Sequence, residues 1–266
     1  MVGHLLLRGM LVGVVAGLLA FGFGKLFGEP PIDRAIAFEE QMSHAASHAH
    51  DDSAAHAHAD AQSHSHAEAG SNAGGDHDEP ELVSRATQSG LGLLVAVVVY
   101  GAAIGGLFAL AFAYVHGRIG QQGPRATATL LALAGFVAIV LVPALKYPAN
   151  PPAVGSPDTI GSRTALFFAM LVLSVATLIA SITLARALWA RFGAWNASLI
   201  AAGAFVVAIA LIQYALPEIN EVPEHFSAVV LWHFRVAALG TQLVLWTTIG
   251  VLFGLLTERA AARMHP

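Results

Sequence analysis

Six long apolar stretches constrain what this chain of 266 residues can fold into. Crossing the ~30 Å hydrocarbon core of a bilayer takes about 20 residues of helix, and each stretch has about that length. Within lipid, only helices and closed barrels pair all of their backbone N–H and C=O groups. Only 11% of the residues are charged, whereas a soluble domain carries about 25%. The stretches are Leu5–Phe27, Gly90–Tyr114, Ala126–Leu145, Thr164–Ala185, Ala194–Leu216 and Val236–Thr257.

These features predict an all-α polytopic integral membrane protein with about six transmembrane helices. The first stretch could instead be a cleaved signal peptide, although it exceeds the 7–15 apolar residues of a signal core. The sequence has no cysteine, which excludes disulfides and thiolate metal sites. The expected organisation is a first transmembrane helix at 1–27, an extracytoplasmic loop at 28–89 with a disordered His-rich segment at 43–80, a five-helix transmembrane bundle at 90–257 and a cytoplasmic tail at 258–266.

The distribution of charge predicts which side of the membrane each loop faces. Six helices place both termini on one side, together with the second and fourth loops. That side holds seven arginines in short segments and a single acid, Glu258, whereas the other side holds six basic residues and sixteen of the seventeen acids. Basic residues close to helix ends mark the cytoplasmic side. We therefore expect a multi-pass membrane protein with both termini in the cytoplasm.

Eight histidines lie in an acidic segment of the first outer loop. Residues Ser43–Glu79 include no aromatic or β-branched residue, so the segment cannot offset the entropy of ordering and should be mobile. Three His-x-His units would each place two imidazoles on one side of an extended chain. Pro31 could open a short helix toward His48, on which Glu40, His44 and His48 share one face. The candidate metal ligands are Glu40, His44, His48, His50, His56, His58, His64, His66 and His77.

Imidazole is a borderline ligand that suits divalent transition metals, whereas sulfur ligands suit softer ions. Capture by this segment should have modest affinity and should weaken in acid, because protons compete with the metal for histidine. The five methionines form no cluster, which weighs against a Cu(I) pathway. The alternative is that the segment is a low-complexity linker, in which the histidines serve only to keep it soluble.

Three outer segments, 28–40, 145–152 and 216–226, are rich in proline and in polar residues. Carboxylate, amide and imidazole groups bind divalent cations, and acids ring many cation entrances, so we expect a vestibule on the outer face. Alternatively, these acids are solvated loop residues that pair with Lys25, Lys146 or Arg235. The vestibule candidates are Glu29, Asp33, Glu39, Asn150, Glu218, Asn220, Glu221, Glu224, His225 and His233.

Glycines recur at four-residue spacing in the first two stretches, at Gly9, Gly13 and Gly17 and again at Gly101 and Gly105. Such spacing lets helix backbones approach closely, so it predicts tight helix packing or an oligomer contact. The sequence has no nucleotide-binding loop, no H-E-x-x-H and no serine elbow. We expect neither an ATP motor nor an enzyme, no organic cofactor and no nucleic-acid partner.

Several outer segments together resemble the CbtA family, predicted cobalt transporter subunits of bacteria and archaea. The resemblance covers nearly the whole chain except residues 43–80. It implies a place in a bacterial or archaeal cytoplasmic (inner) membrane. It implies uptake of cobalt as Co²⁺ for cobalamin synthesis, and a small one-span partner, CbtB, with a histidine-rich terminus. That family is usually described with five spans, whereas six are counted here, and the histidine-rich feature also occurs in this chain. The residues that carry the resemblance are Gly28–Glu40, Arg85–Gly90, Pro143–Pro152, Leu216–Glu224, Phe234–Ala237 and Gly240–Trp246.

The leading hypothesis is a transporter subunit that takes up a divalent transition metal, Co²⁺ first, captured by its His-rich outer loop. Ni²⁺ or Zn²⁺ transport, and efflux, are alternatives within the same class. A pore-less metal sensor or chaperone of the membrane is an alternative from another class. A haem or metal oxidoreductase is disfavoured, because the spans lack paired histidines. The expected partners are membrane lipid, a CbtB-like subunit and a further copy of the chain in a homo-oligomer.

Overall fold

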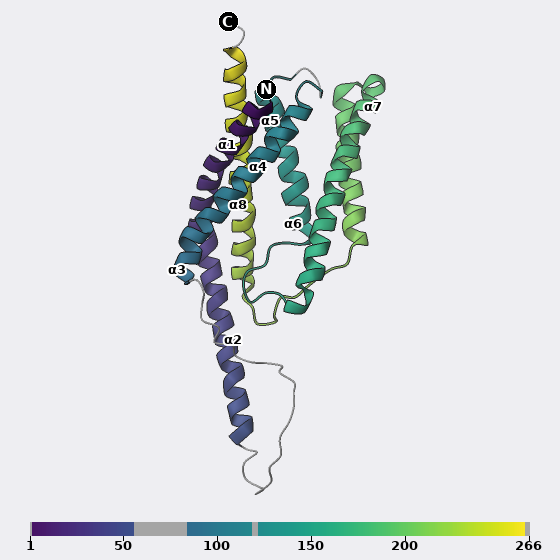
Figure 1. The fold of residues 1–266 in the computed structure, drawn as a ribbon. Coiled ribbons are helices and arrows are strands. Elements are labelled where there is room, and N and C mark those ends of the chain that lie inside the picture. Colours follow the sequence, from purple (N-terminus) through teal and green to yellow (C-terminus); the bar gives the residue numbers. More distant parts are fainter. Residues whose placement is uncertain (1, 56–83, 119–121, 264–266) are drawn as a thin grey trace, which may run out of the picture.

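The computed structural model describes residues 2–55, 84–118 and 122–263. Every regular element in these ranges is a helix, which confirms the predicted all-α fold (Figure 1). Five of the helices are long and apolar enough to cross a membrane. The first residues of α1 and the last residues of α8 lie at the same end of the bundle.

The chain begins with one continuous helical rod. It consists of α1 (Val2–Phe23), the π-helical turn η1 (Gly24–Gly28) and α2 (Glu29–Ala55). The π-turn has a local cause, because Pro30 and Pro31 lack the N–H groups that would bond to the carbonyls one turn earlier. The helix predicted from Pro31 toward His48 is confirmed. It passes through residue 28, where we expected the chain to leave the first span, and continues to Ala55.

This extension corrects the predicted pairing of His48 with His50. That pair was predicted on an extended chain, whereas the backbone of α2 is helical as far as Ala55. Positions two apart on a helix do not share a face, so the geometry on which that pair was predicted is absent. His56, His58, His64, His66 and His77 lie outside the described residues.

The second span packs tightly against the first. It comprises α3 (Arg85–Thr87), the π-turn η2 (Gln88–Gly92) and α4 (Leu93–Val115), and it begins at Ser84, whose hydroxyl accepts a hydrogen bond from the Thr87 amide. A Cβ atom on Gly101 would lie 2.5 Å from the carbonyl oxygen of Gly13, and one on Gly17 would lie 2.8 Å from that of Val97. The repeated glycines therefore form an intramolecular contact between α1 and α4, as the tight-packing prediction required.

The third span is also interrupted by a π-turn, and the element that follows it folds back on itself. The third span is α5 (Pro124–Gly135), η3 (Phe136–Leu141) and α6 (Val142–Lys146), and Pro143 follows the π-turn closely. After the short 3₁₀ turn η4 (Pro157–Thr159), α7 (Ile160–Ala215) reverses direction at Gly193, which has φ 72° and ψ 164°. Figure 1 shows α7 as two adjacent antiparallel segments. The fourth and fifth predicted stretches both lie within this one element.

The last helix, α8 (Ala228–Ala262), completes the main core. Phe253 of α8 packs edge-on against Phe108 and Phe112 of α4, with ring centroids 5.4 and 5.1 Å apart. Leu245, Trp246 and Ile249 extend the same core toward α5 and α1. A separate, smaller cluster joins α6 to both halves of α7.

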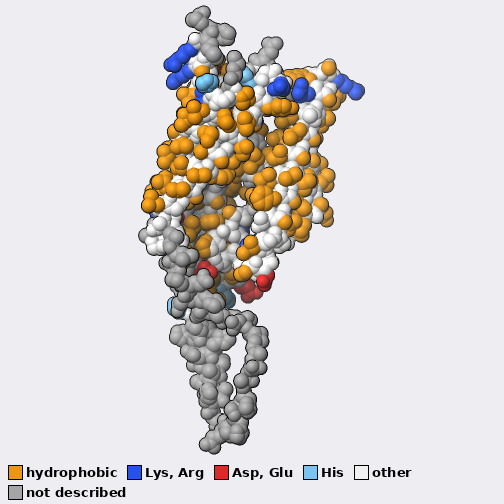
Figure 2. Space-filling model, viewed as in Figure 1, with side chains coloured by type: hydrophobic (Ala, Val, Ile, Leu, Met, Phe, Trp, Pro, Cys, Tyr) orange, Lys and Arg blue, Asp and Glu red, His pale blue; other side chains and the backbone are white. Residues whose placement is uncertain are grey.

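The surface of the bundle matches a membrane environment. Large apolar side chains such as Leu107, Val172 and Leu211 are more than 60% exposed. Figure 2 shows apolar side chains over the middle of the visible face, Lys and Arg at the end where α1 begins, and Asp and Glu at the opposite end. We call the second of these ends the acidic end.

Candidate functional site

The acidic end is assembled from three segments that are far apart in the sequence. Ala35 of α2, Val154 of the loop before α7 and Phe226 of the loop before α8 are buried against one another. The rings of Phe38 and Phe226 meet edge to face with centroids 5.2 Å apart. The three polar segments singled out from the sequence therefore adjoin one another in the structure.

An ion-pair network links the start of α2 to the start of the second span. The Nη2 atom of Arg85 lies 2.9 Å from Glu29 Oε2 and 3.1 Å from Asp33 Oδ1. The Glu29 side chain is 11% exposed, whereas that of Asp33 is 64% exposed. Glu29 and Asp33 are four residues apart on α2, so they share a helix face. Nearby, Lys25 of η1 donates to the carbonyl and hydroxyl oxygens of Ser89 in η2, at 3.1 and 3.2 Å.

A second network joins the two loops at the acidic end. Glu221 Oε2 accepts a hydrogen bond from the Ser156 amide, at 3.0 Å, and forms an ion pair with Arg163 Nη1, at 3.1 Å. Gly155 has φ 128°, and a Cβ atom there would lie 2.9 Å from the Arg163 Cζ, so the position requires glycine. The Thr159 hydroxyl, then the Ser156 amide and Arg163, hold the pKa of Glu221 below its ordinary value, although partial desolvation opposes them.

Further contacts fix the loop between α6 and α7. Arg235 Nη2 donates to Asn150 Oδ1 at 3.0 Å, and Lys146 Nζ lies 3.6 Å from Glu218 Oε1. The Tyr147 hydroxyl donates to the Pro217 carbonyl at 2.8 Å, and desolvation raises the pKa of Tyr147. The alternative that these acids are loop residues paired with Lys25, Lys146 or Arg235 fits Glu218, which pairs with Lys146. Glu29, Asp33 and Glu221 pair with other arginines, Arg85 and Arg163.

A cavity of about 240 Å³ lies on the membrane side of Glu29. Most of its lining is apolar and comes from α1, α2, α4 and α8, together with η1. Three residues with polar side chains contribute to the lining, Glu29 of α2 and Thr241 and Gln242 of α8, and the Thr241 hydroxyl already donates to the Ala237 carbonyl. Gln242 Oε1 is buried and has no hydrogen-bond partner. The cavity thus joins a buried carboxylate to a free carbonyl oxygen, and both are groups that can bind a cation.

A family model described as a probable cobalt transporter subunit, CbtA, matches residues 2–258. The chain belongs to the CbtA family. The family description supports a membrane-embedded transporter subunit with a metal as its substrate, and it fits the expectation that the chain is not an enzyme. The word subunit implies at least one partner chain. No curated protein and no solved structure matches this CbtA protein.

The remaining candidates of this CbtA chain lie on exposed positions. Asn220 Oδ1 accepts from the Val222 amide at 3.4 Å, which fixes the turn before α8. No group of three or more His, Asp or Glu side chains with metal-binding geometry occurs within residues 2–55, 84–118 and 122–263. A preformed metal cage is therefore absent from that part of the chain. The exposed candidates are Glu39, Glu40 and His44 on α2, Asn220, Glu224 and His225 in the last loop, and His233 on α8.

Arg85, Arg163 and Gln242 belong to the site but were not candidates from the sequence. Arg85 was noted only as part of the resemblance to the family, because nothing in the sequence shows which acids it pairs with. Gln242 carried a usable signal, since it is a polar side chain within an apolar span, where an unsatisfied polar group is costly. Gln213 is a comparable case, but its amide donates to the Val142 carbonyl at 3.1 Å and so joins α7 to the third span.

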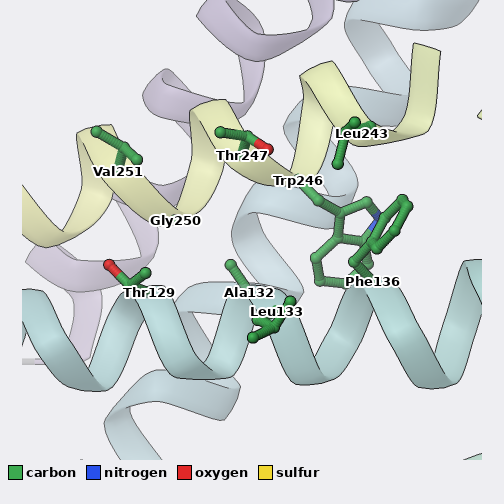
Figure 3. Close-up of a pocket in the computed structure, with 9 residues that line it drawn as sticks. All are labelled: Thr129, Ala132, Leu133, Phe136, Leu243, Trp246, Thr247, Gly250 and Val251. Atoms are coloured by element: carbon green, nitrogen blue, oxygen red, sulfur yellow. The ribbon is translucent and has the colours of Figure 1, made fainter. Parts of the chain in front are cut away.

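A second hollow, of about 190 Å³, lies on the outside of the bundle between α5 and α8 (Figure 3). Its floor includes Ala132, Trp246 and Gly250, and its rim includes the exposed residues Leu133 and Val251. The Trp246 ring packs against Gly135, where a Cβ atom would lie 2.7 Å from Cη2. The lining carries no charged group. This hollow contributes to helix packing and has no metal-binding chemistry.

Proposed function

We propose that this chain is the membrane subunit through which a divalent transition metal, Co²⁺ first, enters the cytoplasm for cobalamin synthesis. The observation that carries the proposal is the position of Glu29. Its buried carboxylate lies where the acidic end meets a cavity between α1, α4 and α8. Carboxylates and free carbonyl oxygens at a membrane opening favour cations. Membership of a family described as cobalt transporter subunits supports the choice of metal.

The charge distribution supports inward transport. Arginines gather at the end that holds the first residues of α1 and the last of α8, so we place that end in the cytoplasm and the acidic end outside. A helix rises 1.5 Å per residue, so α7 would be far too long for one crossing, and its reversal at Gly193 gives two crossings and six in all. An inside-negative potential contributes about 2.3 kcal/mol per charge per 100 mV, which favours uptake of a dication.

The histidine segment at 43–80 has the role of a capture device in this proposal. Its imidazoles collect hydrated ions at the outer face and raise their concentration near the acidic end. Glu40, His44 and His48 recur every fourth residue along α2, so one face of that helix leads from the segment toward Glu29 and Asp33. The Glu29 and Asp33 carboxylates then replace part of the ion's hydration shell. A one-span, His-rich partner would supplement this capture.

Uptake of labelled Co²⁺ tests the proposal. Cells that lack the chain should accumulate less Co²⁺ than the same cells supplied with it. In proteoliposomes, an inside-negative potential should speed uptake, and Ni²⁺ and Zn²⁺ should compete less well than unlabelled Co²⁺. Glu29→Gln should lower the flux at least tenfold. Glu218→Gln is the matched control, because that carboxylate is 92% exposed.

The alternatives predict different results. A pore-less sensor or chaperone would bind Co²⁺ when purified, while cells with and without it accumulated equal amounts of cobalt, nickel and zinc. Net loss of Co²⁺ from loaded cells that contain the chain would show efflux. A greater uptake of Ni²⁺ or Zn²⁺ than of Co²⁺ would reassign the metal.

A further inference from the structure

Arg85 binds its two carboxylates in an unusual way. Arginine commonly holds carboxylates through two parallel N–H groups, but here a single nitrogen, Nη2, contacts both Glu29 and Asp33. Its Nε atom is buried and has no partner. Only part of the hydrogen-bonding capacity of the guanidinium is used, so this contact is weaker than a two-pronged pair would be. The side chain is also 36% exposed, which leaves it room to move away.

The charges at this contact do not balance. Two carboxylates face one guanidinium, so one negative charge remains uncompensated next to the cavity. A dication would neutralise both carboxylates, whereas a monovalent ion would supply only the charge that Arg85 already provides. Because Arg85 is tethered to the chain, it has a high effective concentration at the carboxylates and outcompetes a free monovalent ion.

The backbone on both sides of the contact departs from regular α-helix. The π-turn η1 ends immediately before Glu29, and η2 begins shortly after Arg85. Such turns are rare and occur frequently at functional sites. Lys25 joins the two turns through its bonds to Ser89. The start of the second span is therefore held to the first rod mainly by polar contacts, which exchange more easily than apolar packing.

We infer that Arg85 determines charge selectivity: its guanidinium occupies the Glu29 and Asp33 carboxylates and is displaced by a dication but not by K⁺ or Na⁺. The bound dication then lies beside the cavity whose lining includes Gln242, with its buried and unpartnered Oε1 atom. This assignment deepens the proposed function and rests on it, since it concerns the same carboxylates.

Chemical modification of arginine tests displacement directly in the full-length wild-type protein. Phenylglyoxal reacts with free guanidinium groups, and peptide mass spectrometry reports the rate at each arginine. Saturating CoCl₂ should raise the rate of modification at Arg85 on the order of threefold. This factor corresponds to the free energy of a partly exposed ion pair, which the metal would open. KCl at equal ionic strength should leave it unchanged. Arg163 is the internal control, because it pairs with the single carboxylate of Glu221 and its rate should not respond.

Two variants separate displacement from general loosening. Asp33→Asn leaves the 2.9 Å contact of Arg85 with Glu29 in place, so the protein should fold normally and the response to Co²⁺ should disappear. In uptake assays, Arg85→Gln should make Co²⁺ transport sensitive to K⁺, and Arg85→Lys should restore insensitivity. A purely structural role would lower the flux of Arg85→Gln without changing its sensitivity to K⁺.

Three results would overturn the assignment. The rate of phenylglyoxal modification at Arg85 could be unchanged by Co²⁺, it could rise together with the rate at Arg163, or it could still respond to Co²⁺ in Asp33→Asn. The two proposals also fail differently. If Co²⁺ changes the modification rate of Arg85 but cells do not accumulate cobalt, the site is supported and transport is refuted. Accumulation without a response at Arg85 would refute the site alone.

Discussion

The contact between α1 and α4 leaves no room for a side-chain carbon at Gly101. A Cβ atom there would lie 2.5 Å from the Gly13 carbonyl oxygen and 3.1 Å from the Gly17 nitrogen and Cα. Carbon and oxygen atoms rarely approach closer than about 3.3 Å, so the backbones would have to separate by roughly 0.8 Å at this point. All of the atoms in question belong to the backbone and cannot turn aside. Gly101→Ala should therefore force the two helices apart.

Overpacking of this kind costs about 1–3 kcal/mol. For a domain of this size, that corresponds to a fall in the midpoint of thermal unfolding on the order of 5 °C. The midpoint can be measured in detergent from the fraction of protein that remains monodisperse in size-exclusion chromatography after heating. Gly22→Ala is the matched control, because it lies in α1 and a Cβ atom there meets nothing within 4 Å. Equal midpoints for the two variants would refute the close contact between α1 and α4.

Three further predictions concern the loops and the α7 hairpin. Gly193→Ala should destabilise the protein by about 1–3 kcal/mol, because φ 72° with ψ 164° is open essentially to glycine alone, and an unchanged thermal midpoint would contradict the reversal there. Glu221→Gln should lower the thermal midpoint more at pH 7 than in acid well below pH 4.5. The pKa of Glu221 is depressed in the folded protein, so its carboxylate stabilises the fold above the ordinary pKa of 4.5, and that contribution is lost as the pH falls through the lower folded pKa. The exposed Glu224→Gln serves as its control, and an equal loss at both pH values would exclude ionisation as the cause. Deletion of 43–80 should raise the Co²⁺ concentration for half-maximal uptake without abolishing transport, and complete loss of uptake would contradict a capture role.

The sequence predicted the fold well because the membrane imposes strong rules. Apolar length and backbone pairing determine that the spans are helices, and the glycine spacing predicted the close contact of α1 with α4. The helix opened by Pro31 also followed from local chemistry. Its continuation to Ala55 did not, since residues 49–55 include His50, Asp51, Asp52 and Ser53, which are weaker helix formers than alanine.

The candidate site was predictable only in its composition. Acidic loops on alternate connections must emerge on one side, so their gathering at one end followed from counting spans. The ion-pair partner of each acid could not be predicted in this way, because it depends on how each helix is rotated about its axis. Arg85 contacts Glu29 and Asp33, whereas Arg163 contacts Glu221, and no spacing in the sequence distinguishes these choices. The π-turn beside Glu29 adjoins Pro30 and Pro31, whereas the one beside Arg85 has no proline near it and so no comparable signal in the sequence.

The α7 hairpin is the least embedded part of the bundle. Only 17% of its most apolar window is buried, against 28–33% for the other four long helices. Its packing relies on a small cluster centred on Val142, Met170 and Ile209. Local stability follows buried apolar contact, so the hairpin should detach at lower denaturant concentration than the α1–α4–α8 core. Heat or denaturant would then unfold this protein in two stages rather than one, and the glycine-packed core of α1, α4 and α8 would remain folded after the first stage.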